Sequence, residues 1–116
     1  MKHSMGLYEE PFNSIQAGRK TVEVRLNDEK RRQLTIGDSI EFTLVPNSQK
    51  TLTVEIVSLT RYPTFKEMYA SIPASAFDTE NLTLEEMVEE TYDIYTHEQE
   101  SQWGTLAIEV KLLDDE

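Results

Sequence analysis

The sequence predicts an α+β fold in which a small mixed β-barrel is flanked by short helices. Several segments alternate apolar and polar residues with a period of two, which is typical of half-buried strands. Between them lie short segments that begin with helix-capping signals. The last alternating segment closes the chain and must pair with earlier strands, which favours a barrel over a doubly wound sheet. The 116 residues fit one domain, expected to span residues 1–116.

The first elements expected are a strand that ends near Leu7 and a short helix after it. Pro11 suits the first turn of that helix because a proline there loses no hydrogen bond. Phe12 and Ile15 lie three residues apart and share one helix face, and Gly18 supplies the stop. The next strand therefore begins just beyond Gly18.

Residues 20–26 are expected to form that strand, with its two faces of opposite character. Its apolar positions are Val22, Val24 and Leu26, and the polar positions between them are Thr21, Glu23 and Arg25. Because successive side chains of a strand point to opposite faces, the apolar set faces a core. The polar set shares the other face, with Lys20 at the strand entrance. The sequence thus predicts that this face forms the wall of a small polar cleft.

The middle of the chain is expected to hold two further strands. A charged connection over residues 27–32 leads to a turn at 36–38, and alternation resumes over 40–44. A second turn at 46–48 precedes a long strand over 51–59. The apolar phase of this strand shifts by one residue between Ile56 and Val57, which indicates a β-bulge.

Two helices are indicated by capping boxes, in which a threonine is followed three residues later by a glutamate. They begin at Thr64 and Thr83, and the second is expected to run over 83–95 with apolar and aromatic residues at helical spacing. Its other face is acidic and is either simply solvated or a surface for a protein partner. Residues 106–112 alternate again and form the closing strand.

The charge distribution limits the classes of partner. The net charge is −11, but residues 78–116 hold 13 acids and one base, whereas segment 19–32 holds six bases and three acids. A pI near 4.6 argues against strong non-specific binding to duplex nucleic acid, which needs many phosphate contacts. A local basic cleft that takes one nucleotide or a short single strand remains compatible with this balance.

Several other classes of site and location are not expected. The chain has no cysteine, which excludes disulfides, thiolate metal sites and a cysteine nucleophile. Its only histidines, His3 and His97, lack metal-ligand spacing, so neither a metal nor another cofactor is expected. No apolar run approaches the length of a membrane span, and the N-terminus lacks a signal-peptide pattern. We therefore expect a cytoplasmic protein that does not enter a membrane.

The residues around Gly18 carry the strongest chemical signal. Lys20 can act as a base if burial lowers its pKa, Glu23 can accept a proton or a nucleobase N–H, and Arg25 can bind a phosphate bidentately. The alternative interpretation is ordinary charge pairing along a strand, which stabilises by well under about 1 kcal/mol. Spacing alone leaves both interpretations open.

A basic rim and two aromatic residues are further candidates for contact with a nucleic acid. Arg31 and Arg32, joined by Arg19 and Arg61, can contact phosphates without reading a base sequence, or can simply be solvated. Tyr95 and Trp103 are aromatic side chains on which a base can stack, although most aromatic residues of a small domain belong to its core. Trp103 is the better candidate because it stands beside Gly104 at an expected loop-to-strand junction.

Four blocks of the sequence, in order along nearly the whole chain, are similar to the ASCH domain, a branch of the PUA-like superfamily. They are residues 11–25, which contain Gly18-x-Lys20-x-x-Glu23-x-Arg25, and residues 36–42, 62–68 and 95–109. The resemblance implies a PUA-like β-barrel with a cleft at the Lys20, Glu23 and Arg25 positions. It also implies RNA binding, so the expected partner is a short single-stranded RNA or a modified nucleoside.

One related small bacterial group hydrolyses the N4-acetyl group of acetylated cytidine. That group resembles this chain at Lys20, but its nucleophilic threonine stands three residues after the lysine, where this chain has Glu23. The alternative to a binding module is therefore a hydrolase, either an amidohydrolase of such nucleosides or an RNA-cleaving enzyme. Its catalytic candidates are Lys20, Thr21 and Glu23. The ligand-binding candidates are Gly18, Arg19, Arg25, Arg31, Arg32, Arg61, Tyr95 and Trp103.

Overall fold

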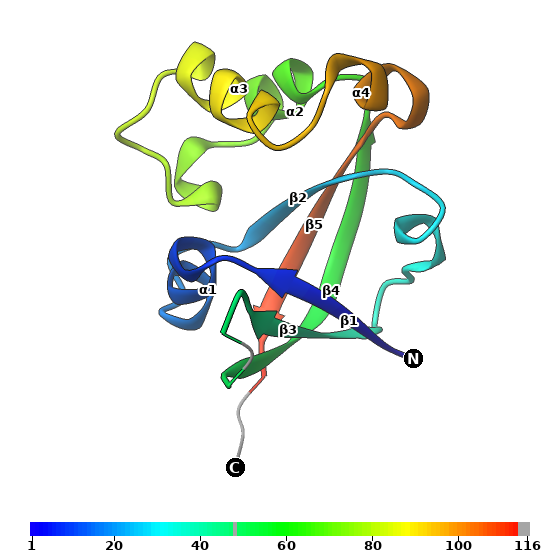
Figure 1. The fold of residues 1–116 in the computed structure, drawn as a ribbon, viewed down its shortest axis with the longest axis vertical. Coiled ribbons are helices and arrows are strands. Elements are labelled where there is room, and N and C mark those ends of the chain that lie inside the picture. The colour runs from blue at the N-terminus through cyan, green and yellow to red at the C-terminus, as the bar shows by residue number, and fades with distance from the viewer. Residues whose placement is uncertain (48, 114–116) are drawn as a thin grey trace.

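The computed structural model describes residues 1–47 and 49–113, and it consists of one five-stranded sheet with helices around it (Figure 1). Ser48, the last residue of the turn expected at 46–48, lies outside the described residues. None of the described helices has the length and apolar character needed to cross a membrane. The elements in chain order are β1 (Lys2–Leu7), α1 (Glu9–Gln16), β2 (Val22–Leu26), η1 (Arg31–Gln33), β3 (Ser39–Leu44), β4 (Thr51–Tyr62), α2 (Phe65–Ser71), η2 (Ala74–Phe77), α3 (Leu84–Tyr92), α4 (His97–Trp103) and β5 (Thr105–Leu112).

The sheet is mixed and has the strand order β1-β3-β4-β5-β2. The pair β1–β3 is parallel, and the other three pairs are antiparallel. The sheet curls into a half-barrel, and a side chain joins its two edge strands because Arg25 of β2 donates from Nη2 to the carbonyl of Gly6 in β1, at 2.8 Å. The predicted α+β fold with a small mixed barrel is confirmed in this open form.

Two apolar clusters cover the two faces of β5. The larger fills the inside of the curl and includes Phe12, Ile15 and Ile108, and the smaller packs α2 and η2 against the outside through Val22 and Ala107. In the antiparallel register, Glu23 stands opposite Ile108. The valine face of β2 therefore packs against helices, as an apolar face should, while its polar face points into the curl. The expected open polar wall is instead largely enclosed.

Several details of the predicted elements are confirmed, and others are corrected. The bulge lies where the phase shift places it, since the β4–β5 register skips between Ile56 and Ser58. Gly18 has a φ of +80°, the conformation that ends a helix at low cost. The strand expected from residue 20 begins at Val22 instead, because the N–H of Thr21 donates to the carbonyl of Ala76 in η2. β4 runs on to Tyr62.

The helical region departs most from the prediction. The helix expected over 83–95 ends at Tyr92, and α4 follows where no helix was expected. This helix has its own capping box, in which Thr96 and Gln99 bond each other's backbone N–H groups. Trp103 is consequently the last residue of a helix, so the loop-to-strand junction expected before Gly104 is wrong.

The capping box of α3 gives a direct test of how firmly this helix is fixed. The Thr83 hydroxyl accepts from the N–H of Glu86 at 3.1 Å, and the Glu86 carboxylate accepts from the N–H of Thr83 at 2.8 Å. We expect Thr83→Ala to lower the free energy of unfolding by about 1 kcal/mol, measured by urea denaturation. Ser101→Ala, at an exposed position inside α4, is the control and should change it little. Equal effects of the two variants would contradict a stabilising cap.

Candidate functional site

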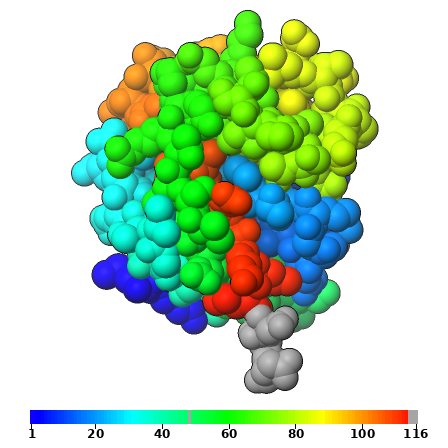
Figure 2. Space-filling view, turned by 180° about the vertical axis from the view of Figure 1, so that it is seen from behind, coloured from blue at the N-terminus to red at the C-terminus, as the bar shows by residue number. Residues whose placement is uncertain are grey.

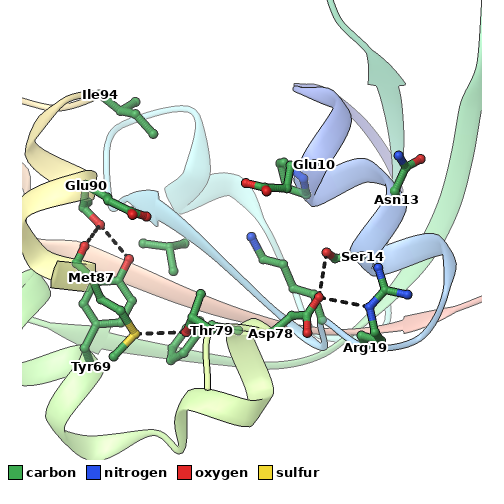
Figure 3. A pocket seen from close by; sticks show the side chains of 15 residues that line it. Glu10, Asn13, Ser14, Arg19, Tyr69, Asp78, Thr79, Met87, Glu90 and Ile94 are labelled. Carbon is green, nitrogen blue, oxygen red and sulfur yellow. Dashed lines mark hydrogen bonds and ion pairs between the residues drawn. The ribbon is translucent and has the colours of Figure 1, made fainter. Parts of the chain in front are cut away.

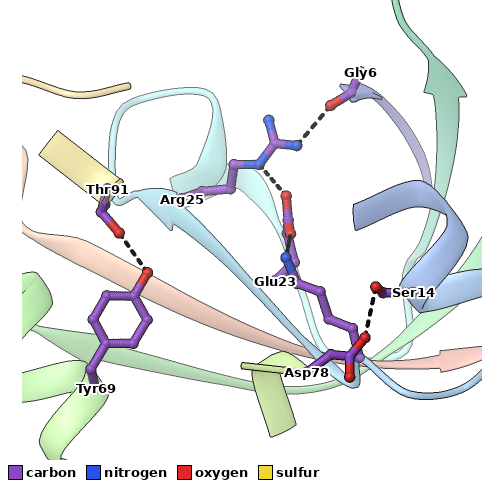
Figure 4. A network of polar contacts seen from close by, with 8 residues as sticks. Gly6, Ser14, Glu23, Arg25, Tyr69, Asp78 and Thr91 are labelled. Atoms are coloured by element: carbon purple, nitrogen blue, oxygen red, sulfur yellow. Dashed lines mark hydrogen bonds and ion pairs between the residues drawn. The ribbon is translucent and has the colours of Figure 1, made fainter. Parts of the chain in front are cut away.

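Lys20, just before β2, and Glu23 and Arg25 of β2 form one charge cluster, which we call the Glu23 triad. Figure 4 shows Glu23 beside Arg25. Glu23 is only 4% exposed. Its Oε1 lies 2.9 Å from Lys20 Nζ, and its Oε2 lies 2.8 Å from Arg25 Nε. Both carboxylate oxygens are thus engaged by cations. Arg25 also reaches Gly6, so the triad closes the seam between the two edges of the sheet.

The electrostatics of the triad fix the charge of its carboxylate. Burial by itself raises the pKa of Glu23, but the Lys20 ammonium and the Arg25 guanidinium outweigh it and hold the pKa below its ordinary value of 4.5. Glu23 is therefore ionised at neutral pH. Its role in this geometry is to orient two cations, because an anionic carboxylate with both oxygens paired is a weak proton acceptor.

A cleft opens beside the triad, between α1 on one side and α2, η2 and α3 on the other (Figure 3). We call it the Lys20 cleft, and its volume is about 490 Å³. The lining residues used below are Ser14, Lys20, Val24, Tyr69, Asp78 and Thr91. Lys20 belongs to both the cleft and the triad. An ammonium carries three donors, and only one of them is needed for Glu23.

At one end of the Lys20 cleft, Asp78 lies within reach of α1. The Ser14 hydroxyl donates to Asp78 Oδ2 at 2.8 Å, and Arg19 Nε donates to the same oxygen at 3.1 Å (Figure 3). The hydrogen bond from Ser14 and the cation of Arg19 lower the pKa of Asp78, which is therefore ionised at neutral pH. Both contacts fall on Oδ2, so among the described residues Oδ1 keeps its capacity to accept.

The opposite wall carries a phenol and an aromatic surface. Tyr69 OH lies 2.7 Å from Thr91 Oγ1, and that hydroxyl donates to the carbonyl of Met87 at 2.9 Å. Because the Thr91 proton is used there, Tyr69 is the donor of the pair. Burial raises the pKa of Tyr69, so the phenol stays protonated. The ring packs edge-on against Phe77, with centroids 5.0 Å apart, which fixes its orientation.

The charges lining the Lys20 cleft nearly balance. Lys20 and Arg19 are the cations, and Asp78, Glu10 and Glu90 are the anions. A polyphosphate would meet three carboxylates there. A ligand that is neutral or singly charged, with several hydrogen-bonding groups, fits this lining better.

Of the four arginines of the expected rim, Arg19 lines the Lys20 cleft and the other three lie elsewhere. Arg31, Arg32 and Arg61 line a second hollow of about 430 Å³ between η1 and the end of β4, which we call the arginine hollow. It shares no lining residue with the Lys20 cleft. Seen from behind, the segment that holds η1 (cyan) lies beside β4 (green) in Figure 2. Trp103 joins this group because the Arg32 guanidinium lies 5.5 Å from the centre of its ring.

Two other candidates of the sequence, Thr21 and Tyr95, do not line the Lys20 cleft. Thr21 is exposed and lines a third hollow together with Gly18, Lys20 and Val57. Tyr95 stacks on Phe65 with centroids 5.6 Å apart, and it lines neither hollow. The structure thus keeps Lys20, Glu23 and Arg25 together, and of the other candidates only Arg19 also lines the Lys20 cleft.

Metal binding and the acidic face of α3 are the remaining features considered from the sequence. Within the part of the chain that the structure describes, no three histidine or acidic side chains gather in a way that would hold a metal ion. The acidic side chains of α3 named by the sequence pattern are exposed, and they are Glu85, Glu86, Glu89 and Glu90. Their use as a protein-binding surface stays a prediction.

Three residues that shape the Lys20 cleft were missed from the sequence, Ser14, Asp78 and Thr91, and a fourth, Tyr69, was assigned to the core by its helical spacing from Phe65. Ser14 and Asp78 are 64 residues apart, and Tyr69 and Thr91 are 22 apart. No local pattern encodes such pairs. One signal was available for Tyr69, which follows Phe65 by one helical turn and therefore shares the face that packs toward the sheet.

Comparison with known proteins agrees with this architecture. Among solved structures, the hypothetical protein PH0355 is 36% identical with a TM-score of 0.86, over 97% of this chain and 100% of its own. Protein PF0455 from Pyrococcus furiosus is 32% identical with a TM-score of 0.78, over 98% and 99% of the two chains. No curated protein matches.

A more distant structure shares the fold alone. The S128A mutant of ZmASCH from Zymomonas mobilis is 14% identical with a TM-score of 0.67, and the match covers 93% of this chain and 66% of that one. The family model of the ASCH domain matches residues 5–114, which include every strand and helix except the first residues of β1. This chain therefore belongs to the ASCH domain family.

Proposed function

We propose that this ASCH domain binds a nucleoside unit in the Lys20 cleft, either as a modified nucleoside or as one residue of a short single-stranded RNA. The observation that carries the proposal is the chemistry gathered in one space of about 490 Å³. An ammonium, a carboxylate and a phenol line it, on Lys20, Asp78 and Tyr69. Small-molecule sites have volumes of roughly 300–1,000 Å³ with a few placed polar groups on apolar walls.

Each group has a matching role toward a nucleoside. The Lys20 ammonium keeps donors for a base carbonyl or a ring nitrogen. Asp78 Oδ1 can accept an exocyclic N–H or a ribose hydroxyl. The ring of Tyr69 and the side chain of Val24 offer apolar surface to the base, and base–aromatic stacking contributes about 1–3 kcal/mol per base. Glu23 supports this arrangement indirectly because it fixes Lys20 Nζ.

Equilibrium dialysis of the whole chain with cytidine and with N4-acetylcytidine tests the proposal. We expect saturable binding of at least one of them, with a Kd below about 1 mM. The nearly balanced charges of the cleft predict that this Kd changes little between low and moderate salt. Ribose is the control ligand, because it lacks the base. Binding of ribose as tightly as the nucleosides, or no binding of either nucleoside, would contradict the proposal.

The hydrolase alternative draws less support from the geometry. A glutamate base would need an accessible carboxylate, whereas Glu23 is buried between two cations with a lowered pKa. Thr21 does not line the Lys20 cleft. We accordingly expect N4-acetylcytidine to be recovered intact from the dialysis. Release of acetate that is lost in Lys20→Ala and Glu23→Ala would favour the hydrolase instead.

A further inference from the structure

We propose that the arginine hollow is a second binding site, which takes a phosphate group independently of the Lys20 cleft. Three arginines line it, Arg31, Arg32 and Arg61, and none of the lining residues that the structure describes is acidic. Its floor is apolar and includes Leu59 and Leu106. The hollow therefore collects positive charge on a low-dielectric base, where an anion is attracted more strongly than at an open surface.

The three guanidinium groups are only partly neutralised. Arg31 Nη1 lies 3.3 Å from Asp28 Oδ2, which is the only ion pair that a described residue makes with the three. Arg32 uses Nε to donate to the carbonyl of Asn27 at 2.8 Å. Arg61 is exposed and forms no ion pair with any residue that the structure describes. One carboxylate against three cations leaves a net positive charge at this place.

Two buried polar atoms beside the hollow have no hydrogen-bond partner within the described part of the chain. They are Arg31 Nε and Asn27 Oδ1, and both residues line the hollow. Asn27 is only 8% exposed. Buried polar groups in native structures are nearly always paired, so an unpartnered donor and acceptor at one place point to a ligand or a water that completes them. A phosphate oxygen accepts from Arg31 Nε–H, and a phosphate-bound water or P–OH can donate to Asn27.

Two of the three guanidinium groups, those of Arg31 and Arg32, are also held in place before any ligand arrives. Arg32 stacks over the Trp103 ring at 5.5 Å while its Nε is tied to the backbone. Arg31 is fixed through Asp28, which also accepts from its backbone N–H at 3.1 Å. Preorganised arginines lose less conformational entropy on binding, and their planar forks match two phosphate oxygens at once. These features together distinguish the hollow from a solvated basic loop.

The hollow and the Lys20 cleft have no lining residue in common. In the register, Val24 stands opposite Ala107, and Val24 lines the Lys20 cleft. Arg25 stands opposite Leu106, which lines the arginine hollow. Neighbouring strand positions point to opposite faces. A phosphate bound at the arginines would therefore not compete with a nucleoside bound at Lys20, and each site can be tested alone.

The test is a backbone-amide NMR titration of the whole chain with inorganic phosphate, with chloride at equal ionic strength as the reference. We expect saturable shifts at Asn27, Arg31, Arg32 and Arg61, and at the indole N–H of Trp103. Arg61→Gln should weaken phosphate binding by about fivefold or more. Lys50→Gln removes a charge from an exposed position of the β3–β4 hairpin and should leave it unchanged. Absence of these shifts, or equal weakening in the two variants, would overturn the proposal.

A second arm separates free phosphate from the phosphodiester of a nucleic acid. If a trinucleotide RNA shifts the same signals, and Arg61→Gln lowers the salt dependence of its affinity by about one phosphate contact, the bound group is a backbone phosphate. If inorganic phosphate binds and the trinucleotide does not, the group is a free phosphate. Cytidine carries no phosphate and reports the Lys20 cleft alone. Its failure would contradict the proposed function and leave this inference standing.

Discussion

Replacing Glu23 by glutamine is expected to lower the free energy of unfolding by about 3 kcal/mol. The carboxylate is buried and bonds Lys20 and Arg25 through separate oxygens. These two side chains are 15% and 13% exposed, so water can replace little of what they lose. Glutamine keeps the shape but leaves two mostly buried cations facing each other without a counter-charge. Urea denaturation of the whole chain measures the loss.

The matched control is Glu41→Gln, which removes the partner of Lys2 in an exposed ion pair 3.6 Å long. That variant should lower the free energy of unfolding by less than about 1 kcal/mol.

The pH dependence of the free energy of unfolding is a second test of the role of Glu23. Because the pKa of Glu23 lies below 4.5 in the folded protein, its stabilising effect is complete above pH 4.5 and is lost as the pH falls below it. The stability difference between wild type and Glu23→Gln should shrink in that acidic range. Equal losses in Glu23→Gln and Glu41→Gln would contradict the structural role of the triad.

Replacing Lys20 by methionine is expected to weaken nucleoside binding by about tenfold or more. Methionine keeps most of the apolar stem, but it removes the ammonium that lines the cleft. Hydrogen bonds that involve a charged donor contribute more than neutral ones, which sets the size of the effect. Dialysis with the nucleoside that wild type binds measures the change in Kd.

Two controls separate loss of binding from loss of folding. Lys50→Met makes the same chemical change at the exposed β3–β4 hairpin and should bind the nucleoside as wild type does. The free energy of unfolding of Lys20→Met shows whether it is folded under the binding conditions, since Glu23 keeps only Arg25 as a partner. A folded Lys20→Met variant with an unchanged Kd would place the nucleoside outside this cleft.

Much of the fold could be predicted because short-range patterns of the amino-acid sequence encode it. Alternation of apolar and polar residues located the strands, and the phase shift at Ile56 located the β-bulge. The positive φ of Gly18 agrees with its predicted role as the residue that ends a helix. Helix α4 was missed because its capping box pairs Thr96 with Gln99, whereas the two helices predicted from capping signals pair a threonine with a glutamate. Helix α2 has the same length of seven residues and was found from its Thr64 cap, so the capping signal decided which short helix could be found.

The site could be predicted only in part, for a physical reason. Residue spacing predicted that Lys20, Glu23 and Arg25 lie together. It could not distinguish a polar face that is open to solvent from a contact between the two edge strands of the sheet. That distinction depends on the curl of the sheet, which places Gly6 beside Arg25. The same holds for Asp78, whose contact with Ser14 depends on how η2 packs against β2 and α1. Long-range packing decides which polar residues meet a ligand.

The central claim is that a nucleoside occupies the Lys20 cleft, and a backbone-amide NMR titration with cytidine or N4-acetylcytidine at low salt tests it most directly. We expect saturable shifts concentrated at residues 13–24 and 76–79 and around Tyr69 and Thr91, with little change at residues 27–32 and at Arg61. Shifts confined to the arginine hollow, or a spectrum that does not move, would contradict the claim.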